Sequence, residues 1–382
     1  MYDPRINKVR ETLRDKGIDS LLISNFFNIL YLTGFKTLTK DEREAFVLVT
    51  KKKIYLFSDE RYLDGSSKFE VGSLKLELKL IKPEKGLISH LQEIVKEEQI
   101  KTLGFEAEDL RFNEYQKLKE SLSSLALLAM DRLIVKIREI KDEDEINCIQ
   151  KACEIGDQCL SEITRFIKQG TTEKEIAFKI EMWLKERGHD IAFDPIVAID
   201  ANSAVAHYNT KDGEGVVKNG SVILIDFGVK HKDYVSDITR MAFFGRPSDE
   251  VKHVYEVLLQ AQEKTVEKVA DSDLLKDIDD FCRKLITNPS TTSTSLSINP
   301  LRTNNLPAYP HSTGHGVGLE IHEYPKVSFN STDRKQVNQI FTIEPGVYFP
   351  GKFGMRIEDT LVVEENLKAR TLTKFPKSLL II

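Results

Sequence analysis

Residues 221–229 read Ser-Val-Ile-Leu-Ile-Asp-Phe-Gly-Val, and residues 234–245 read Tyr-Val-Ser-Asp-Ile-Thr-Arg-Met-Ala-Phe-Phe-Gly. Both runs are apolar and β-branched, which predicts two strands joined by a short loop. If Lys230–Asp233 form a four-residue hairpin loop, Asp226 lies directly opposite Asp237. Like charges in that arrangement repel, and a cation between them would remove the conflict. The alternative is a pair of solvent-facing aspartates near a turn.

A second acidic pair is predicted further along the chain. The segments 341–344 and 355–363 flank a connection rich in glycine and proline. If this connection turns symmetrically about Gly351, Glu344 lies opposite Glu358. The two pairs together supply enough negative charge to neutralise two divalent ions.

Between the acidic pairs, residues 311–323 read His-Ser-Thr-Gly-His-Gly-Val-Gly-Leu-Glu-Ile-His-Glu. The three glycines disfavour a regular helix and let the backbone approach a ligand closely. A zincin His-Glu-x-x-His motif is excluded, because Lys326 occupies the position of its second histidine.

Half of the histidines lie near the acidic pairs in the sequence. The chain has eight histidines, and these four are His207, His311, His315 and His322. Carboxylate oxygens with one or two imidazoles suit Mn²⁺, Co²⁺ or Fe²⁺ better than a cysteine-type structural zinc site. Two such ions can activate a water between them, so the residues predict a dinuclear metallohydrolase.

The order of these residues resembles a known group of enzymes, the dinuclear metallopeptidases of the pita-bread fold, which include methionine aminopeptidase, aminopeptidase P and prolidase. The residues that carry the resemblance are Asp226, Asp237, His315, Glu344 and Glu358, in the stretches Ile-Asp-Phe-Gly (225–228), Tyr-Val-Ser-Asp-Ile-Thr-Arg (234–240), 311–323, Thr-Ile-Glu-Pro-Gly-Val-Tyr (342–348) and Met-Arg-Ile-Glu-Asp-Thr (355–360). The N-terminal third resembles a creatinase-type domain. That domain, with a histidine four residues before His315, favours the Xaa-Pro branch over methionine aminopeptidase.

The resemblance implies a role for each acidic residue. Asp226 would chelate one metal ion, and Asp237 and Glu358 would bridge both ions. His315 and Glu344 would bind the other ion, and Glu344 would also take a proton from the bridging water as general base. The implied cofactor is two divalent ions per chain, Mn²⁺ in the first place, with Co²⁺, Fe²⁺ or Zn²⁺ as alternatives.

The resemblance also implies roles for residues around the ligands. His207 and His322 match positions that contact the substrate and stabilise the tetrahedral intermediate, and His311 matches a position that lines the site. Arg356 would orient the acidic ligands. Lys326, which follows His-Glu-Tyr-Pro (322–325), would supply a cation for a proline carboxylate.

The implied reaction is hydrolysis of the bond between an N-terminal residue and proline in di- or oligopeptides. Lys326 and the short interval between Glu344 and Glu358 favour an Xaa-Pro dipeptidase over an aminopeptidase P acting on longer peptides. Two further alternatives are a metal-free creatinase-like hydrolase and a non-enzymatic binding protein of the same fold. Both are disfavoured, because such relatives lack the ligand set that is present here.

The pattern along the chain predicts two domains. Alternating strand-like and helix-like runs in residues 1–132 predict a creatinase-like α/β domain. Residues 137–382 would form a pita-bread catalytic domain with a curved antiparallel sheet and flanking helices. Ile137–Lys168 reads as one long helix, and the Ser/Thr/Asn/Pro-rich stretch 287–310 reads as a surface-loop insertion.

Composition adds the class of protein and its environment. The chain has 382 residues, of which 41% are hydrophobic, a net charge of −5 and four cysteines. These values indicate a globular protein with reduced thiols and give no electrostatic case for nucleic acid or an anionic membrane. The sequence shows no signal peptide pattern or membrane-length apolar run, so we expect a cytoplasmic protein. The resemblance further implies a homodimer.

Overall fold

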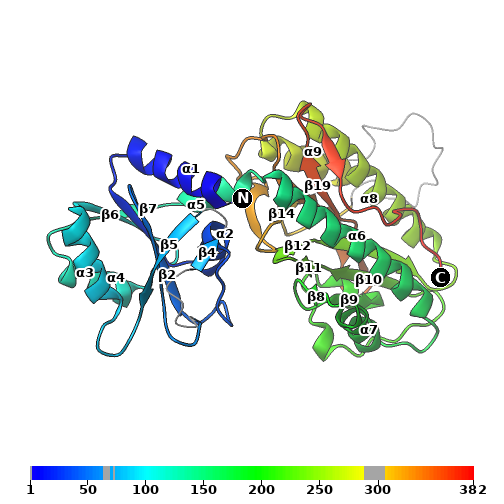
Figure 1. Cartoon of the computed structure of the whole chain (residues 1–382). Helices are drawn as coiled ribbons and strands as arrows, with labels where there is room; N and C mark the ends of the chain where they lie inside the picture. Colours follow the sequence, from blue (N-terminus) through cyan, green and yellow to red (C-terminus); the bar gives the residue numbers. More distant parts are fainter. Residues whose placement is uncertain (1, 63–68, 72–73, 288–305) are drawn as a thin grey trace. The chain divides into compact units, whose positions relative to one another are not determined.

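The computed structural model describes residues 2–62, 69–71, 74–287 and 306–382. The chain forms two compact units, the first ending at Arg138 and the second beginning at Glu139 (Figure 1). The expected mixed α/β fold class is confirmed. The domain boundary expected between residues 132 and 137 stays a prediction.

The first unit is built on one sheet of seven strands in the order β4-β5-β3-β2-β1-β6-β7. Its strands are β1 (Ser20–Ile23), β2 (Ala45–Thr50), β3 (Ile54–Ser58), β4 (Phe69–Val71), β5 (Leu74–Leu80), β6 (Thr102–Glu106) and β7 (Ala126–Met130), and its helices are α1 (Tyr2–Asp15), α2 (Phe26–Thr33), α3 (Leu87–Glu98), α4 (Phe112–Ser121) and α5 (Leu133–Glu139). Leu91 of α3 and Leu118 of α4 pack with Leu22 and Phe57 of the sheet. These two helices therefore cover one face of it.

In its described residues, the second unit combines small antiparallel sheets with four long helices. The helices are α6 (Glu143–Phe166), α7 (Glu173–Glu186), α8 (Asp249–Lys268) and α9 (Leu275–Thr287), with 3₁₀ turns η1 (Asp200–Ala204), η2 (Thr210–Asp212) and η3 (Val269–Asp271). The strands are β8 (Asp190–Ile191), β9 (Ile196–Ile199), β10 (Val222–Phe227), β11 (Val229–His231), β12 (Tyr234–Val235), β13 (Ile238–Phe243), β14 (Gly314–Gly316), β15 (Glu323–Val327), β16 (Ile340–Ile343), β17 (Gly346–Phe349), β18 (Phe353–Arg356), β19 (Asp359–Val363) and β20 (Ala369–Thr371). The sheet orders are β13-β10-β9, β12-β11-β8, β15-β14-β16-β19-β20 and β17-β18.

Strand β10 is buried on both faces, which explains its continuous apolar sequence. Ile223 and Ile225 point toward α6 and α7, in one hydrophobic core. Val222 and Leu224 point the opposite way, into a second core with α8 and α9. Asp226 comes near the end of this strand, and its acidic side chain belongs to neither hydrophobic core.

The first predicted hairpin forms, but its predicted register is wrong. The loop between β11 and β12 has two residues, Lys232 and Asp233, at φ 48° and 69°, and not four. Positive φ at both loop positions matches a primed turn, whose twist suits a tight hairpin. As a result Asp226 lies opposite Thr239 rather than Asp237. Asp237 instead occupies the break between β12 and β13, where the chain passes from one small sheet to another.

The second predicted hairpin is confirmed, including its centre. Gly351, at φ 76°, lies in the turn, and β17 pairs with β18 in the register that a turn centred there requires. Ile343 pairs with Asp359 in the same register on the far side of the hairpin. Glu344 and Glu358 lie between these two ladders, opposite each other.

The prediction of one long helix over residues 137–168 is wrong, because the structure has two helices there, α5 and α6. The cause is local: Asp142 caps α6 by accepting a hydrogen bond from the backbone N–H of Glu145, whose carboxylate returns to Asp142. Side-chain caps also begin two other helices, Thr172 at α7 and Ser248 at α8. The predicted insertion 287–310 lies mostly outside the described residues.

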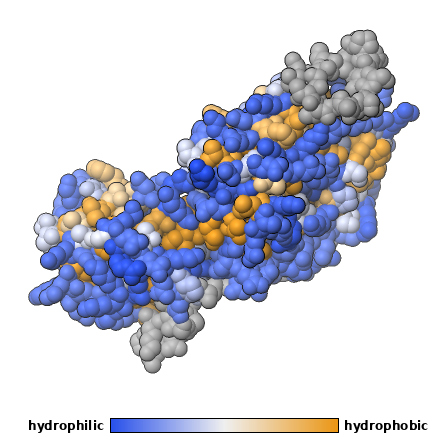
Figure 2. Space-filling view, turned by 90° about the horizontal axis from the view of Figure 1, so that it is seen from above, coloured by the Kyte–Doolittle hydropathy of each residue, from blue (hydrophilic) through white to orange (hydrophobic). Residues whose placement is uncertain are grey.

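The visible surface is mainly polar. Figure 2 shows hydrophilic residues over most of this face, with apolar residues between them. Among the residues that the structure describes, no helix combines the length and the apolar character that a membrane span requires.

Candidate metal centre

One cavity of about 460 Å³ in the second unit brings together all ten residues that the sequence singled out. They are His207, Asp226, Asp237, His311, His315, His322, Lys326, Glu344, Arg356 and Glu358. Phe193 and Ile196 add apolar wall, and Glu323 adds a further carboxylate. The cavity size is in the range of small-molecule sites.

The acidic residues reach the cavity from points where strands end. Asp226 is the last residue but one of β10, and Asp237 stands at the break before β13. Glu344 and Glu358 flank the β17–β18 hairpin, outside both of its neighbouring ladders. Asp237, Glu344 and Glu358 lie outside the strands, whereas Asp226 is paired on both sides within β10. All four side chains line the same cavity.

His315 is held in the cavity wall by a close backbone approach. It lies in β14 between Gly314 and Gly316. A Cβ atom on Gly314 would overlap the carbonyl oxygen of Thr342, and one on Gly316 would overlap that of Tyr324. Only glycine therefore fits at both positions, and the close approach is to neighbouring backbone, whereas the sequence led us to expect an approach to a ligand.

The ring of His315 is oriented with Nε2 toward the acidic residues. Its Nδ1 lies 3.1 Å from the carbonyl oxygen of Gly316, so in the neutral ring Nδ1 carries the proton and donates. Its Nε2 lies 3.6 Å from Asp237 Oδ2 and 3.5 Å from Glu344 Oε1. Burial, and next the nearby His322, lower the pKa of His315 to about 3. The Nε2 lone pair is therefore available to a ligand at neutral pH.

Three carboxylate oxygens in this cavity are buried without a hydrogen-bond partner in the described part of the chain. They belong to Asp226 (Oδ1), Asp237 (Oδ1) and Glu358 (Oε1). Burial and then Asp226 raise the pKa of Glu358 to about 8. Burial and then Glu358 raise the pKa values of Asp237 and Glu344 well above their ordinary range. Buried anions without compensation are costly, so the site is built for added positive charge.

Arg356 is the cation that lies among these carboxylates. Its guanidinium is 3% exposed and pairs with Asp226 Oδ2 through Nη2. Its Nε donates to Thr239 Oγ1 at 3.1 Å, and Thr239 Oγ1 in turn donates to Glu358 Oε2 at 2.8 Å. Arg356 thus binds Asp226 directly and Glu358 through Thr239, but one guanidinium cannot neutralise four carboxylates.

Tyr348 joins Arg356 to His311, a contact that the sequence did not suggest. Its hydroxyl accepts from Arg356 Nη1 at 2.9 Å and lies 2.9 Å from His311 Nε2. His311 Nδ1 donates to the carbonyl oxygen of Ser312 at 2.8 Å, so Nε2 accepts from the tyrosine. Burial, and then Arg356, lower the pKa of His311 to about 4. The neutral ring is therefore fixed in place beside the acidic residues.

The three remaining basic residues are exposed. His207, His322 and Lys326 all line the cavity with exposed side chains. The ring centroid of His322 lies 4.4 Å from that of His315, edge to face. These residues can therefore contact a molecule that enters the cavity.

The donor set fits divalent metal ions. Asp237, His315 and Glu358 each offer a ligand atom, and these atoms lie within 4.8 Å of one another. Asp226 and Glu344 line the same cavity. Oxygen donors with one imidazole nitrogen suit Mn²⁺, Co²⁺ or Fe²⁺, and the unpartnered oxygens are the atoms that such ions would bind.

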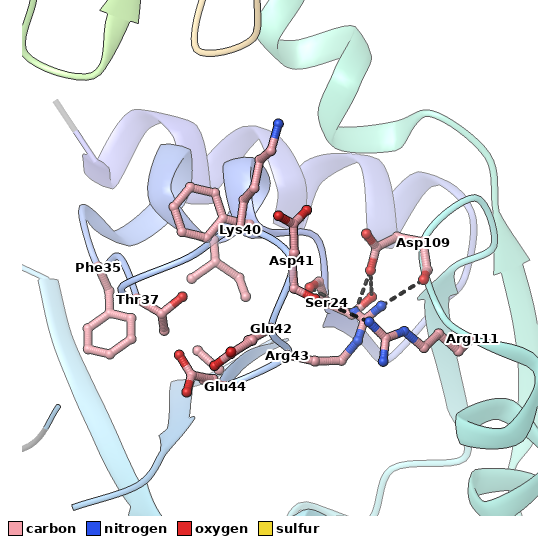
Figure 3. A pocket seen from close by; sticks show the side chains of 13 residues that line it. Ser24, Phe35, Thr37, Lys40, Asp41, Glu42, Arg43, Glu44, Asp109 and Arg111 are labelled. Carbon is pink, nitrogen blue, oxygen red and sulfur yellow. Dashed lines mark hydrogen bonds and ion pairs between the residues drawn. The ribbon is translucent and has the colours of Figure 1, made fainter. Parts of the chain in front are cut away.

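A second cavity, of about 220 Å³, lies in the first unit. Figure 3 shows Arg43 of this cavity bound to Asp109, and Arg43 also donates to the carbonyl oxygen of Ser24 at 2.9 Å. Arg43 already has a carboxylate partner, whereas the cavity of the second unit holds buried carboxylate oxygens with no hydrogen-bond partner among the described residues. The second unit therefore holds the candidate site.

Comparison with protein families covers both units. Residues 147–365 match metallopeptidase family M24, and residues 5–140 match the creatinase/prolidase N-terminal domain. The chain is 31% identical to an Xaa-Pro dipeptidase of Pyrococcus horikoshii over 382 residues, which is 100% of this chain and 99% of the relative.

The solved structures that resemble the whole chain include the following two. The first is an Xaa-Pro dipeptidase from Bacillus anthracis, with a TM-score of 0.86, 31% identity and 100% of both chains covered. The second is an X-Pro aminopeptidase from Thermotoga maritima, with a TM-score of 0.83, 30% identity and 99% of both chains covered. Relatives with this fold thus carry names from both peptidase types.

Proposed function

Because the chain belongs to metallopeptidase family M24, we propose that it is an exopeptidase that uses two divalent ions to hydrolyse the bond between an N-terminal residue and proline. The substrate that we favour is an Xaa-Pro dipeptide. The family membership covers the reaction class, and the relatives named Xaa-Pro dipeptidase support the substrate class.

One observation carries the metal part of the proposal. The unpartnered buried oxygens of Asp226, Asp237 and Glu358 face the same cavity as the free Nε2 of His315. Such an arrangement is costly for a protein that binds nothing there. Divalent ions held by these ligands would supply positive charge that polarises a carbonyl group and acidifies water.

The roles of the chain's own residues follow from their positions. Glu344, beside His315 and with a raised pKa, takes the proton that the attacking water loses. His207 and His322, exposed on the cavity wall, donate hydrogen bonds to the carbonyl oxygen as it becomes negative. Arg356 keeps Asp226 in place through their ion pair.

Substrate length is argued from the cation at the wall. Lys326 lines the cavity, so its ammonium group can pair with the free carboxylate of a dipeptide. A longer peptide has no carboxylate at that point. The second candidate is an Xaa-Pro aminopeptidase, which the likeness to the X-Pro aminopeptidase of Thermotoga maritima favours.

The test is hydrolysis of Ala-Pro and Ala-Pro-Ala after Mn²⁺ loading, together with metal analysis of the loaded protein. We expect about two metal ions per chain and cleavage of Ala-Pro alone. Cleavage of Ala-Pro-Ala would replace the dipeptidase with an aminopeptidase. No cleavage of either peptide by a chain that binds no metal would overturn the proposal.

The proposal also covers the metal ion, the cellular compartment and the assembly of the protein. Mn²⁺ is the metal proposed first, the compartment is the cytoplasm, and the assembly is a homodimer. Mass photometry of the purified chain measures the assembly. Activity after reconstitution with single metals ranks Mn²⁺ against Co²⁺, Fe²⁺ and Zn²⁺.

A further inference from the structure

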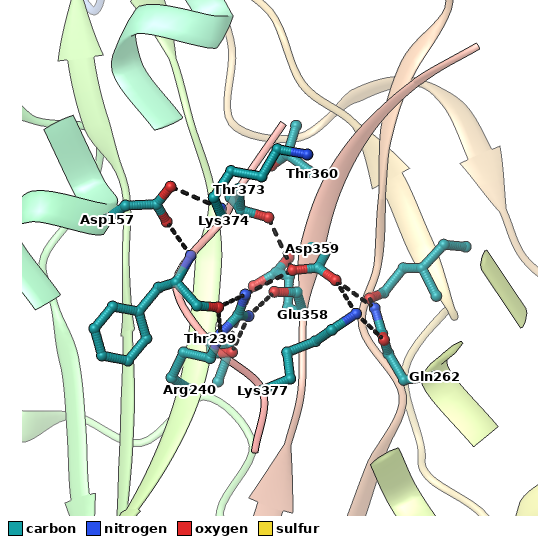
Figure 4. A network of polar contacts seen from close by, with 12 residues as sticks. Asp157, Thr239, Arg240, Gln262, Glu358, Asp359, Thr360, Thr373, Lys374 and Lys377 are labelled. Carbon is teal, nitrogen blue, oxygen red and sulfur yellow. Dashed lines mark hydrogen bonds and ion pairs between the residues drawn. The ribbon is translucent and has the colours of Figure 1, made fainter. Parts of the chain in front are cut away.

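A buried ionic network lies directly behind the cavity and is separate from the residues that line it. Its centre is Asp359, the residue after Glu358, which is fully buried. Asp359 Oδ1 accepts from Arg240 Nη2 at 2.7 Å and from Thr373 Oγ1 at 2.9 Å. Asp359 Oδ2 accepts from Lys377 Nζ at 2.7 Å and from Gln262 Nε2 at 3.0 Å (Figure 4).

Arg240 connects this network to the candidate ligand Glu358. All five of its N–H donors are used, which is the full capacity of a guanidinium. Nε and Nη2 donate to the carbonyl oxygen of Phe375 at 3.1 and 2.9 Å, and Nη2 also binds Asp359. Nη1 donates to the carbonyl oxygen of Thr239 at 3.0 Å and to that of Glu358.

The position of Glu358 depends on these bonds more than on sheet pairing. Glu358 lies between β18 and β19, outside both ladders. Its backbone N–H donates to the carbonyl oxygen of Thr239 at 3.2 Å, and its own carbonyl oxygen accepts from Arg240. Both backbone polar groups of Glu358 are therefore attached to Thr239 and Arg240 of β13.

A C-terminal segment, residues 373–377, holds the far side of the same arginine. Asp157 of α6 accepts the backbone N–H groups of Lys374 at 2.7 Å and Phe375 at 2.9 Å. Lys377 Nζ also donates to Gln262 Oε1 at 2.9 Å. The segment thus delivers a carbonyl oxygen to Arg240 and an ammonium group to Asp359.

We propose that Lys377 and Asp359 are positioning residues, which act through Arg240 to hold Glu358 where its carboxylate binds a divalent ion. Neither residue lines the cavity. Without Lys377, Asp359 keeps one of its two cations, so its carboxylate shifts toward Arg240. The guanidinium of Arg240 then changes position as well, because it is bound to this carboxylate. The carbonyl group of Glu358, which accepts a hydrogen bond from Arg240, moves with the guanidinium. This inference rests on the proposed metal-dependent function, since it concerns one ligand of that centre.

The experiment measures metal binding directly, with Co²⁺ alone as the probe. Lys377→Met removes the ammonium group from a side chain that is 21% exposed, so a folded protein is expected. We expect calorimetric titration to show about tenfold weaker Co²⁺ binding at one site. The visible absorption spectrum of the Co²⁺-loaded chain changes as well. Lys377→Arg, which keeps the cation, restores most of the affinity.

Lys335→Met is the matched control in the same unit. Lys335 is a buried lysine whose Nζ binds the carbonyl oxygens of Val269, Ala270 and Leu367, and it does not line the cavity. Its loss lowers stability without moving Glu358, so Co²⁺ affinity and spectrum should match those of the wild type. If Lys377→Met does not fold, Thr373→Val removes one hydrogen bond to Asp359 and carries the test.

The outcomes separate the two proposals. Wild-type Co²⁺ affinity and spectrum in a folded Lys377→Met or Thr373→Val chain would overturn the positioning role alone. An equal loss of affinity in Lys335→Met would overturn it as well, because the effect would then follow general stability. A wild-type chain that binds no Co²⁺ would overturn the proposed function, and this inference with it.

Discussion

Glu358 and Asp359 are consecutive acidic residues with opposite environments. Glu358 faces the cavity with one oxygen unpartnered, and burial and Asp226 raise its pKa to about 8. Asp359 faces the network behind the cavity and accepts four hydrogen bonds; burial raises its pKa, but Arg240 and Lys377 bring it down to about 2. The chain thus compensates one buried carboxylate completely and leaves its neighbour open. The open side is where an external cation fits.

The largest effect is expected at a cavity carboxylate, Glu344. Glu344→Gln keeps the size of the side chain but cannot accept the proton of the attacking water. We expect kcat for Ala-Pro to fall by about 10³-fold, with an unchanged circular dichroism spectrum. Glu250→Gln, at an exposed residue paired with Lys352, is the control and should keep full activity. Normal turnover by Glu344→Gln would remove Glu344 from the mechanism.

On the network side, Asp359→Asn should damage the fold. The new amide would direct a donor toward Lys377 or Arg240, which would lose their buried counter-charge. We expect urea unfolding to show a loss of about 3–5 kcal/mol. Asp194→Asn, at an exposed ion pair with Lys211, should change stability by less than about 0.5 kcal/mol. A loss of stability as small as this in Asp359→Asn would contradict the view that Asp359, unlike Glu358, is fully compensated within the chain.

Glu358→Gln should stabilise the metal-free chain, which is the opposite of the effect expected for Asp359→Asn. It removes a buried carboxyl group whose ionisation is disfavoured by burial and by Asp226, while keeping an acceptor for Thr239. We expect the free energy of unfolding of the metal-free chain to rise by a few kcal/mol, because the pKa of Glu358 is raised from 4.5 to about 8 and a tenfold change in an ionisation constant corresponds to about 1.4 kcal/mol. The same variant should gain less stability from Mn²⁺ than the wild type. Destabilisation of the metal-free variant would show that Glu358 is compensated within the chain.

The smallest effect is a dependence of metal-free stability on pH. The pKa of Glu358 is about 8 when folded and 4.5 when unfolded, so between these values the folded chain binds more protons. Its stability therefore falls as pH rises. The lowered pKa of His315 makes stability rise with pH, but mainly below pH 6.5, the pKa of the unfolded histidine.

Urea unfolding in the presence of a chelator measures this dependence. From pH 6.5 to 8 we expect a loss of about 1 kcal/mol. Saturating Mn²⁺ should flatten the slope, because bound metal keeps the carboxylates ionised. A metal-free chain whose stability rises over this interval would contradict the raised pKa of the cavity carboxylates.

The two acidic hairpins show what sequence could predict. The Glu344–Glu358 register was predictable because one glycine marks the turn and both flanking ladders continue the same pairing. The Asp226–Asp237 register was wrong because nothing in Lys-His-Lys-Asp (230–233) specifies positive φ at only the last two positions. The two aspartates still meet at the cavity, through a break between sheets that local patterns do not encode.

The supporting residues were harder to find than the candidate ligands. The ligands fall in short motifs, whereas Asp359 depends on Gln262, Thr373 and Lys377, which come from distant parts of the chain. Arg240 carried a partial signal, since an arginine within an apolar strand implies a buried partner. Its partners could only be known after folding.

The C-terminal residues also have a consequence for how the protein is made. Ile382 exchanges backbone hydrogen bonds with Phe243 and Gly245 at the end of β13, and residues 373–377 close the network behind Glu358. A nascent chain released from the ribosome before residue 373 would contain every candidate ligand without their support. Premature termination in this short segment should therefore yield a protein that cannot be loaded with metal and is open to proteolysis.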